Sequence, residues 1–440
     1  MCLKLDHESK EVSGRVVPRP CRSVTDAGMA DGSARRNFWV IAIEGALFGG
    51  AMNLVSTTTL LPKMIESYGG PTWLIAAIPI LGPVGFLLPP ILSAHHVEHF
   101  KRYKPFAVWC GLMQRLPYAA AAVVLLCAPG WAVAVLAAVA LAPLLSGVFG
   151  GLGLTSWQQL FTRCVQRERR HAVFAIRSAV GGGLGVLAGF VVAGILATWP
   201  GATGFGMLHA LTFLVLMGSL GVFVLTREPE EENPVPAARS NLLTHLSTIP
   251  REVLADGHFV LLLLTRFFRN GLFIIAPFLA IHCQAVLGRP SSFLGKLLTV
   301  QMLGALAGNA IAAAVGARRG SKATLMCGLL VFAAMSAAAV AAKTEMEWLG
   351  IFGLFGAGAS LCEVGSSTLG LEMGRRERRA TFLAVGALVN LPAMLMASGL
   401  SYWFHDRFEL LAMATLISIL VSIAFLVPLK EPHEQTATGC

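Results

Sequence analysis

The chain has 440 residues, of which 55% are hydrophobic and only 13% are charged, and its formal net charge is +10. Soluble domains carry about 25% charged residues, so this composition excludes an ordinary soluble protein and indicates that a lipid bilayer is the solvent. The Lys and Arg residues lie in short loops between apolar runs, and this distribution excludes the nucleic-acid partner that the basic charge alone would favour.

Residues 1–36 are polar and contain no early apolar run, which excludes a signal peptide. Their composition predicts a disordered cytoplasmic tail. Met29 would serve as a start site as well as Met1, so we assign neither structure nor function to the first 28 residues.

Twelve apolar segments follow the tail, and each is about long enough to cross ~30 Å of hydrocarbon as a helix. Prolines and glycines interrupt several of them, which is tolerated in lipid where neighbouring helices cover the freed backbone groups. The sequence therefore predicts an all-α, polytopic membrane protein with 12 transmembrane helices. The segments are residues 37–62, 72–94, 105–128, 131–162, 172–198, 204–226, 258–287, 292–316, 322–342, 347–372, 380–404 and 408–428.

A short arginine-rich motif occurs twice, after the fourth segment and again after the tenth. Each copy is followed by a similar apolar phrase, Ala172-Val173-Phe174-Ala175 in one case and Ala380-Thr381-Phe382-Leu383-Ala384 in the other. Matching positions in the two halves predict two pseudo-symmetric six-helix bundles, residues 37–226 and 258–430. Arginine-rich turns favour the cytoplasmic face, where they anchor the topology. The anchoring residues are Arg167, Arg169, Arg170, Arg376, Arg378 and Arg379.

The remaining segments complete the predicted topology. Residues 227–257 form a charged cytoplasmic linker, whose spacing of leucines is compatible with an amphipathic helix on the membrane surface, and residues 431–440 form a cytoplasmic tail. Basic residues gather in alternate loops, so the positive-inside rule places both termini in the cytoplasm. We expect an integral membrane protein of a bacterial plasma (inner) membrane.

Twelve helices in two repeated halves resemble the major facilitator superfamily (MFS) of secondary transporters, without pointing to a subfamily. That family carries a loop motif between helices two and three, roughly Gly-x-Leu-Ala-Asp-Arg-x-Gly-Arg-Lys. The stretch from Ala94 to Tyr103 corresponds to it, with Glu98 at the acidic position and Arg102 at an arginine position, but Ala94, His99 and Lys101 depart from it. The resemblance implies alternating access, a central cavity lined by helices one, seven and ten, and Glu98 and Arg102 as candidates for a gating ion pair.

Ionisable residues inside a membrane helix cost roughly 3 kcal/mol or more, so each needs a partner, water or a function. Counting residues from the helix ends places Arg266, Arg269 and Glu363 near the middle of the bilayer. We expect Glu363 to face one of these arginines and to bind a proton or a cationic substrate. The alternative is a structural ion pair that locks two helices together.

Three further groups belong to the candidate site. Arg115 lies deep in the third segment without an acidic residue in its own helix, which favours an anionic or zwitterionic substrate. Glu44 and Arg177 lie at similar shallow depths, so we expect a salt bridge between them or contact with the interface. Asn53 and Asn270 are candidates for substrate contact or for hydrogen bonds between helices.

The sequence predicts a transporter that moves a small solute by alternating access, with protons as a candidate coupling ion. The alternatives are an exporter of amphipathic compounds or lipids and, from another class, a transport-inactive membrane scaffold or sensor. No acid pair, histidine cluster or nucleophile–base arrangement points to an enzyme, and the nine cysteines lack metal-site spacing. We therefore expect no cofactor and no metal, membrane lipids as partners, and a monomer.

Overall fold

The computed structural model describes residues 24–87, 89–90, 93, 97, 100–229, 257–373 and 379–430, with the backbone alone at residues 24–31, 167, 371, 379–385 and 387. Several features of the sequence lie outside this part of the chain or outside its described side chains. They are residues 1–23, Glu98, the linker after residue 229, Arg376, Arg378, the tail after residue 430, and the side chains of Arg167 and Arg379.

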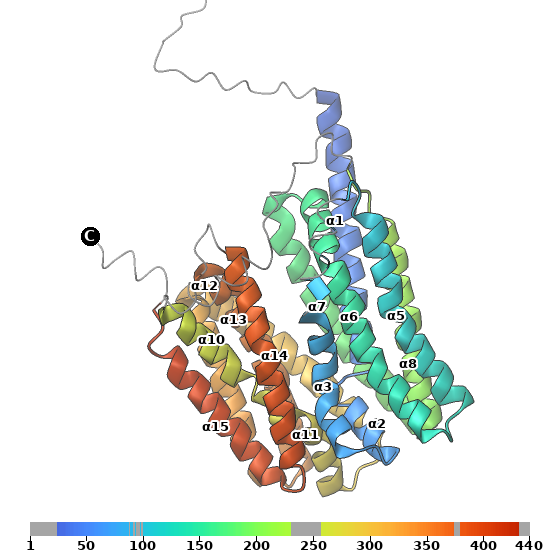
Figure 1. Cartoon of the computed structure of the whole chain (residues 1–440), viewed down its shortest axis with the longest axis vertical. Coiled ribbons are helices and arrows are strands. Elements are labelled where there is room, and N and C mark those ends of the chain that lie inside the picture. Colours follow the sequence, from blue (N-terminus) through green and yellow to red (C-terminus); the bar gives the residue numbers. More distant parts are fainter. Residues whose placement is uncertain are drawn as a thin grey trace, which may run out of the picture.

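The described part of the chain is α-helical, as predicted, and its helices match the twelve predicted segments in order (Figure 1). Eight of its helical spans are long and apolar enough to cross a membrane. The first half contains α1 (Val24–Asn53), α2 (Leu61–Ser67), α3 (Thr72–Leu87), α5 (Lys104–Cys127), α6 (Ala132–Cys164), a 3-10 turn η1 (Arg167–Arg169), α7 (Arg170–Thr198) and α8 (Ala202–Val224). The second half contains α10 (Gly257–Arg269), α11 (Leu272–Leu287), α12 (Phe293–Ala341), α13 (Glu345–Met373), α14 (Arg379–Trp403) and α15 (Phe408–Leu426).

The first predicted segment differs from the structure at both ends. Helix α1 begins at Val24, so residues 24–36 are helical rather than part of an irregular tail. Good helix formers at Ala34 to Arg36 favour this extension, and the Asn37 side chain bonds the backbone of Arg227 after α8. The helix ends at Asn53, where the Leu54 N–H donates to the Ala51 carbonyl oxygen in a turn, and α2 begins at Leu61.

Two other helical stretches have an irregular backbone at a glycine. In α12 the backbone leaves the helical region at Gly320 (φ 79°, ψ −178°), a conformation that favours glycine, so the helix is two spans joined by a sharp turn, as the segments 292–316 and 322–342 predict. The segment 258–287 is divided at Asn270–Gly271 into α10 and α11. A Cβ at Gly271 would collide with Ser418, so glycine there permits close packing against α15.

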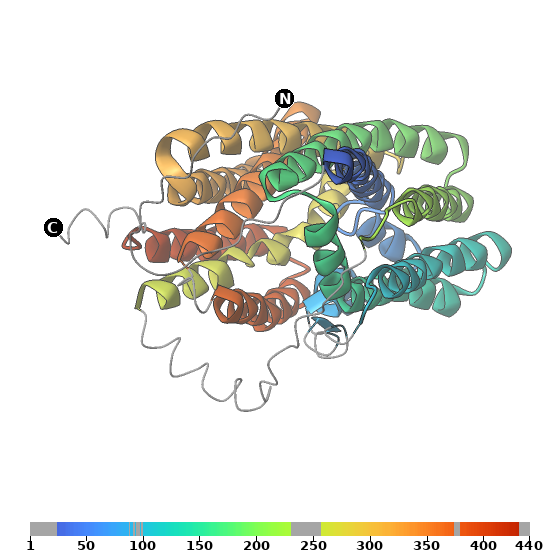
Figure 2. The ribbon, with the colours of Figure 1, turned by 90° about the horizontal axis from the view of Figure 1, so that it is seen from above.

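The two halves lie side by side as separate helix bundles in both ribbon views (Figures 1 and 2). In the first half α1 packs against α7 and α8, and α5 packs against α6 and α8; in the second half α13 and α15 pack against α12. The halves meet where α7 runs along α12 and where α3 contacts α11 and α14.

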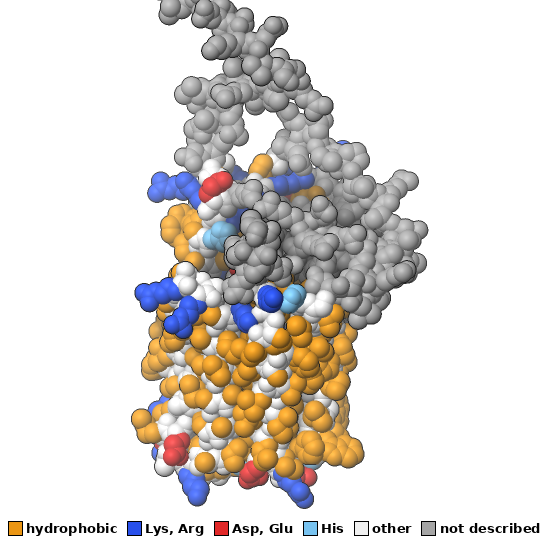
Figure 3. Space-filling model, turned by 90° about the vertical axis from the view of Figure 1, so that its left-hand side faces the viewer, with side chains coloured by type: hydrophobic (Ala, Val, Ile, Leu, Met, Phe, Trp, Pro, Cys, Tyr) orange, Lys and Arg blue, Asp and Glu red, His pale blue; other side chains and the backbone are white. Residues whose placement is uncertain are grey.

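Charged residues mark the two ends of the molecule. The start of α5, the turn at η1 and the kink of α12 lie at one end, which we call the arginine-rich end because these segments carry or adjoin Arg102, Arg169, Arg170, Arg318 and Arg319; α2 lies at the other, the α2 end. Between them the visible face is covered by hydrophobic side chains, with Lys and Arg along one border and both charge signs along the other (Figure 3). This belt is the surface expected of a protein surrounded by lipid.

Candidate functional site

A cavity of about 480 Å³, which we call the central cavity, lies between the two halves. Helices α1 and α7 form one wall, and α12 and α13 form the other. Its polar and charged lining consists of Asn53, Arg177, Ser178, Asn309, Ser360 and Glu363. The cavity therefore gathers groups from both bundles, as a shared binding site requires.

Glycines bring the helices around the central cavity close together. Gly45 and Gly49 of α1 and Gly181 and Gly182 of α7 line its wall, and α1 and α7 pack along each other. At Gly181 a Cβ would lie 3.4 Å from the Ala46 carbonyl oxygen, in contact with the α1 backbone. Because glycine has no side chain, α1 and α7 can pack closely and still leave space in front of Arg177 and Asn53, which line the cavity.

Glu363 faces the central cavity without an ionic partner among the described residues. Its side chain is exposed, and Ser367 one turn along α13 donates a hydrogen bond to Oε1 at 3.3 Å. The expectation that it pairs with Arg266 or Arg269 is wrong. These arginines instead donate to backbone carbonyl oxygens of α13, Arg266 to Ser366 at 2.7 Å and Arg269 to Cys362 at 3.2 Å.

Arg266, Arg269 and Asn270 lie beside the central cavity rather than in its lining. Arg266 is 8% exposed, and its guanidinium occupies the space over Gly370 of α13 and Gly386 of α14, where a Cβ would collide with it. Asn270 is buried and donates from Nδ2 to Oδ1 of Asn390 at 2.9 Å, which joins the end of α10 to α14. The geometry gives these residues a role in packing the second half.

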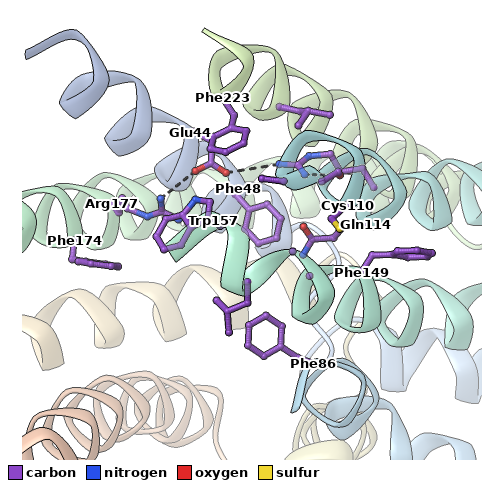
Figure 4. Close-up of a pocket in the computed structure, with 17 residues that line it drawn as sticks. Glu44, Phe48, Phe86, Cys110, Gln114, Phe149, Trp157, Phe174, Arg177 and Phe223 are labelled. Atoms are coloured by element: carbon purple, nitrogen blue, oxygen red, sulfur yellow. Dashed lines mark hydrogen bonds and ion pairs between the residues drawn. The ribbon is translucent and has the colours of Figure 1, made fainter. Parts of the chain in front are cut away.

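A second cavity of about 290 Å³, which we call the aromatic recess, lies inside the first half (Figure 4). Glu44 lies in it between two arginines from other helices. The Arg177 Nη1 atom is 3.1 Å from Glu44 Oε2, and the Arg115 Nη2 atom is 3.8 Å from Glu44 Oε1. The pair of Glu44 and Arg177 matches the expected salt bridge, whereas Arg115, which lacks an acid in its own helix, finds one in α1.

The Arg115 guanidinium is held by the protein at every nitrogen. Nε donates to the Leu216 carbonyl oxygen at 2.7 Å, Nη1 donates to the Gly111 carbonyl oxygen at 2.6 Å, and Nη2 donates to the Ser219 hydroxyl at 3.4 Å. Ser219 in turn donates to the Glu44 carbonyl oxygen at 3.0 Å. Arg115 is 3% exposed and each of its three nitrogens has a partner in the protein, so it fixes α5 against α1 and α8.

Six of the side chains that line the recess are aromatic. Arg177 lies over the Trp157 ring at 5.1 Å, and Arg115 lies over the Phe48 ring at 5.4 Å. Phe48, Phe174 and Arg177 line both the recess and the central cavity, so the two cavities adjoin at these side chains. The aromatic lining consists of Phe48, Phe86, Phe149, Trp157, Phe174 and Phe223.

The sequence did not identify the phenylalanines of the recess, because a phenylalanine in an apolar helix is as hydrophobic as the residues around it. A signal for Phe174 was present, since it belongs to the phrase that follows the repeated arginine motif. Glu228 was also missed as part of the linker. It accepts hydrogen bonds from the backbone N–H groups of Tyr103 at 2.8 Å and Lys104 at 3.0 Å, which caps the start of α5.

The described arginines at the arginine-rich end lie near helix ends. Arg170 donates from Nε to the Val165 carbonyl oxygen at 3.2 Å and from Nη2 to the Thr162 carbonyl oxygen at 2.8 Å, so it closes the turn between α6 and α7. Arg169 is exposed in the same turn, and Arg102 lines a surface hollow beside Glu228. Whether Arg102 pairs with Glu98 lies outside the described residues.

The sequence matches no family model and no curated protein, whereas the structure is similar to several solved transporters. The chain is 12% identical to the nucleoside transporter NupG and 12% identical to a D-xylose-proton symporter, with a TM-score of 0.68 in each case; the match covers 89% of this chain and 98% of each of those chains. A bacterial homologue of the iron transporter ferroportin, in an inward-facing state, is 14% identical with a TM-score of 0.65, over 90% of this chain and 98% of that chain. These are transporters rather than enzymes, and they share one membrane fold with this chain.

Proposed function

We propose that this chain, an integral membrane protein with the fold of the MFS transporters, moves a small solute across the membrane by alternating access. The central cavity supports this most, because it places polar and charged groups of both halves around one space in the middle of the molecule. A site shared by two bundles can be exposed at alternate ends when the bundles rock about it.

The charges inside the membrane favour an anionic or zwitterionic solute. The described membrane spans contain Arg115, Arg177, Arg266 and Arg269, of which the last two lie inside the span Gly257–Leu287, against Glu44 and Glu363. In the central cavity, however, Arg177 and Glu363 balance each other. A solute with a carboxylate, with or without an ammonium group, matches this lining best.

Contacts at the α2 end support a cavity that opens towards the arginine-rich end. Thr59 of the first half donates to Oε1 of Gln301 in the second half at 2.9 Å, and both side chains are buried. Gly295 of α12 lies against the backbone of Gly189 and Ala193 in α7, with no room for a Cβ. The halves are therefore in contact on one side of the central cavity, as one state of a rocking cycle requires.

The aromatic recess favours a second candidate function, the export of amphipathic compounds. Six aromatic side chains beside an arginine would accept a flat apolar group together with a charge. Import and export use the same cycle and differ in the gradient that drives it, so this candidate concerns direction and substrate rather than mechanism. We expect a monomer, protons as the coupling ion, and a bacterial inner membrane with both termini in the cytoplasm.

The test is transport by purified protein in liposomes. Compounds that raise the melting temperature of the protein are first selected from metabolite classes, and their exchange is then measured across liposomes that contain the same compound inside. We expect saturable exchange above that of empty liposomes. If stabilising ligands bind but none is exchanged, the protein is a sensor or scaffold rather than a transporter.

A further inference from the structure

Arg177 lies where the aromatic recess meets the central cavity, and its guanidinium is only partly used by the protein. Nη1 donates to Glu44 Oε2 at 3.1 Å and to the Ile41 carbonyl oxygen at 3.2 Å. Nε and Nη2 have no hydrogen-bond partner among the described residues, and the side chain is 20% exposed. Arg177 therefore keeps donors for a ligand, in contrast to Arg115, whose nitrogens are all engaged.

The charge of the recess favours an anion beside Arg177. Arg115, Arg177 and Glu44 are the charged residues that line it, so its lining carries a formal charge of +1. Glu44 lies 3.1 Å from Arg177 and 3.8 Å from Arg115, so the two guanidinium groups share the excess charge, and the donors that remain for an anion are those of Arg177. A carboxylate matches the planar guanidinium and can accept two parallel hydrogen bonds from it.

The shape and chemistry of the recess favour an aromatic ring. A volume of about 290 Å³ suits one small ring system, and the walls present Phe86, Phe149 and Trp157 to it. Aromatic faces and edges attract another ring beyond the effect of burying apolar area. Gln114 projects into the same space, where Gly150 leaves room for its amide, and supplies a polar contact at the wall (Figure 4).

We infer that the solute is a small aromatic carboxylate, whose ring enters the aromatic recess while its carboxylate is held by Nε and Nη2 of Arg177 at the edge of the central cavity. This inference rests on the proposed transport function and specifies its substrate class. Gly45 supports the role of Arg177, because a Cβ at Gly45 would collide with the guanidinium. Glycine at this position of α1 therefore leaves the space that the Arg177 guanidinium occupies.

The first test measures binding to the purified full chain in lipid nanodiscs by titration calorimetry. The probes are phenylacetate and indole-3-acetate, with phenylacetamide as the uncharged match and acetate as the match without a ring. We expect the aromatic carboxylates to bind at least about tenfold more tightly than the amide and than acetate, since a charge-assisted pair and a buried ring each contribute about 1.4 kcal/mol or more. Absence of binding by both aromatic carboxylates, or equal binding of phenylacetate and phenylacetamide, overturns the inference.

The second test moves the guanidinium without removing its charge. Gly45→Ala displaces the flexible end of Arg177, and Gly183→Ala in α7 is the matched control because its Cβ would meet nothing within 4 Å. We expect Gly45→Ala to weaken phenylacetate binding about tenfold or more and Gly183→Ala to leave it unchanged. Trp157→Leu keeps Arg177 and removes a ring of the wall, so it should weaken phenylacetate more than acetate. Wild-type affinity in both Gly45→Ala and Trp157→Leu would exclude the recess as the binding site.

The two proposals fail in different ways. If liposomes with the protein exchange other solutes while no aromatic carboxylate binds, transport stands and the substrate class is wrong. If phenylacetate binds and Gly45→Ala and Trp157→Leu weaken its binding, but no compound is exchanged, the site stands and transport is wrong.

Discussion

At the scale of single residues, Glu44 is a charged group that joins three helices of the first half. It is 7% exposed and contacts Arg177 and Arg115, which belong to two other helices. Glu44→Gln would leave two arginines inside the membrane without an anion. Removal of one partner from a buried ion pair costs about 3 kcal/mol or more, so we expect a clear fall in the melting temperature of the purified protein.

Glu66→Gln is the matched control for this prediction. Glu66 pairs with Lys63 at the α2 end, and the two side chains are 38% and 24% exposed. Ion pairs in contact with water contribute less than about 1 kcal/mol, so this variant should unfold close to the wild-type temperature. Equal shifts in the two variants would show that Glu44 is not a structural centre.

Counting residues from the ends of a predicted helix estimates how deep a side chain lies in the membrane, and this estimate predicted some contacts and missed others. Glu44 and Arg177 share a depth, so their pairing was predictable, and Glu363 and Asn53 stood out because polar groups in apolar helices are rare. The contact between Arg115 and Glu44 was not predictable, since counting residues assumes helices perpendicular to the bilayer and membrane helices tilt by about 20° on average. Contacts between helices depend on tilt and rotation, which neighbours set.

At the scale of helices, the contact of α7 with α12 decides which end of the central cavity is closed. A Cβ at Gly295 would collide with the backbone of Gly189 and Ala193. Backbone atoms cannot move aside as a flexible side chain can, so Gly295→Ala should separate the halves at the α2 end. We expect a longer distance between spin labels at Lys63 and Lys343, which lie at this end in opposite halves.

Gly194→Ala is the matched control, because a Cβ at Gly194 would meet nothing within 4 Å although the residue lies in the same part of α7. It should leave the label distance unchanged. An unchanged distance in Gly295→Ala as well would mean that this contact does not hold the halves together.

The helices also show why apolar segments predict the number and order of membrane spans better than the residues at which each helix begins and ends. Hydrophobicity identified twelve spans in the right order, but it does not report backbone geometry. Residues 54–62 have the composition of a continued first span, whereas α1 ends at Asn53 and a new helix starts beside Pro62. The break at Asn270–Gly271 is similarly hidden inside a continuous apolar run. Such breaks depend on local hydrogen bonds and on neighbouring helices.

At the scale of the whole molecule, the distribution of arginines predicts the orientation in the membrane. The turn that contains Arg169 and Arg170 lies at the arginine-rich end, and the turn at Gly130 between α5 and α6 lies at the α2 end. The positive-inside rule places the first in the cytoplasm. A reporter that is active only in the cytoplasm should therefore work when fused after Gln166 and fail when fused after Gly130. The reverse pattern would invert the proposed orientation.

Coupling to protons is a property of the whole cycle, and Glu363 is the group that we expect to provide it. Arg177 and Glu363 are the charged residues of the central cavity lining, so uptake of a proton by Glu363 would raise the net charge of this lining by one unit. An anionic solute would then bind more tightly when the carboxyl is protonated, and each would favour the binding of the other. Glu363→Gln fixes the uncharged form.

The variant should therefore lose uptake driven by a pH gradient, because no proton is released at the far side, while exchange of solute for solute continues, since that reaction needs no net movement of protons. Both reactions are measured in the same liposomes, with and without a gradient. Glu66→Gln, whose carboxylate lies at the α2 end outside the cavity, should retain both. Gradient-driven uptake that persists in Glu363→Gln would assign coupling to another group or to another ion. Loss of both reactions would place Glu363 in solute binding itself, so the separation of the two rates is the measurement that identifies a coupling residue.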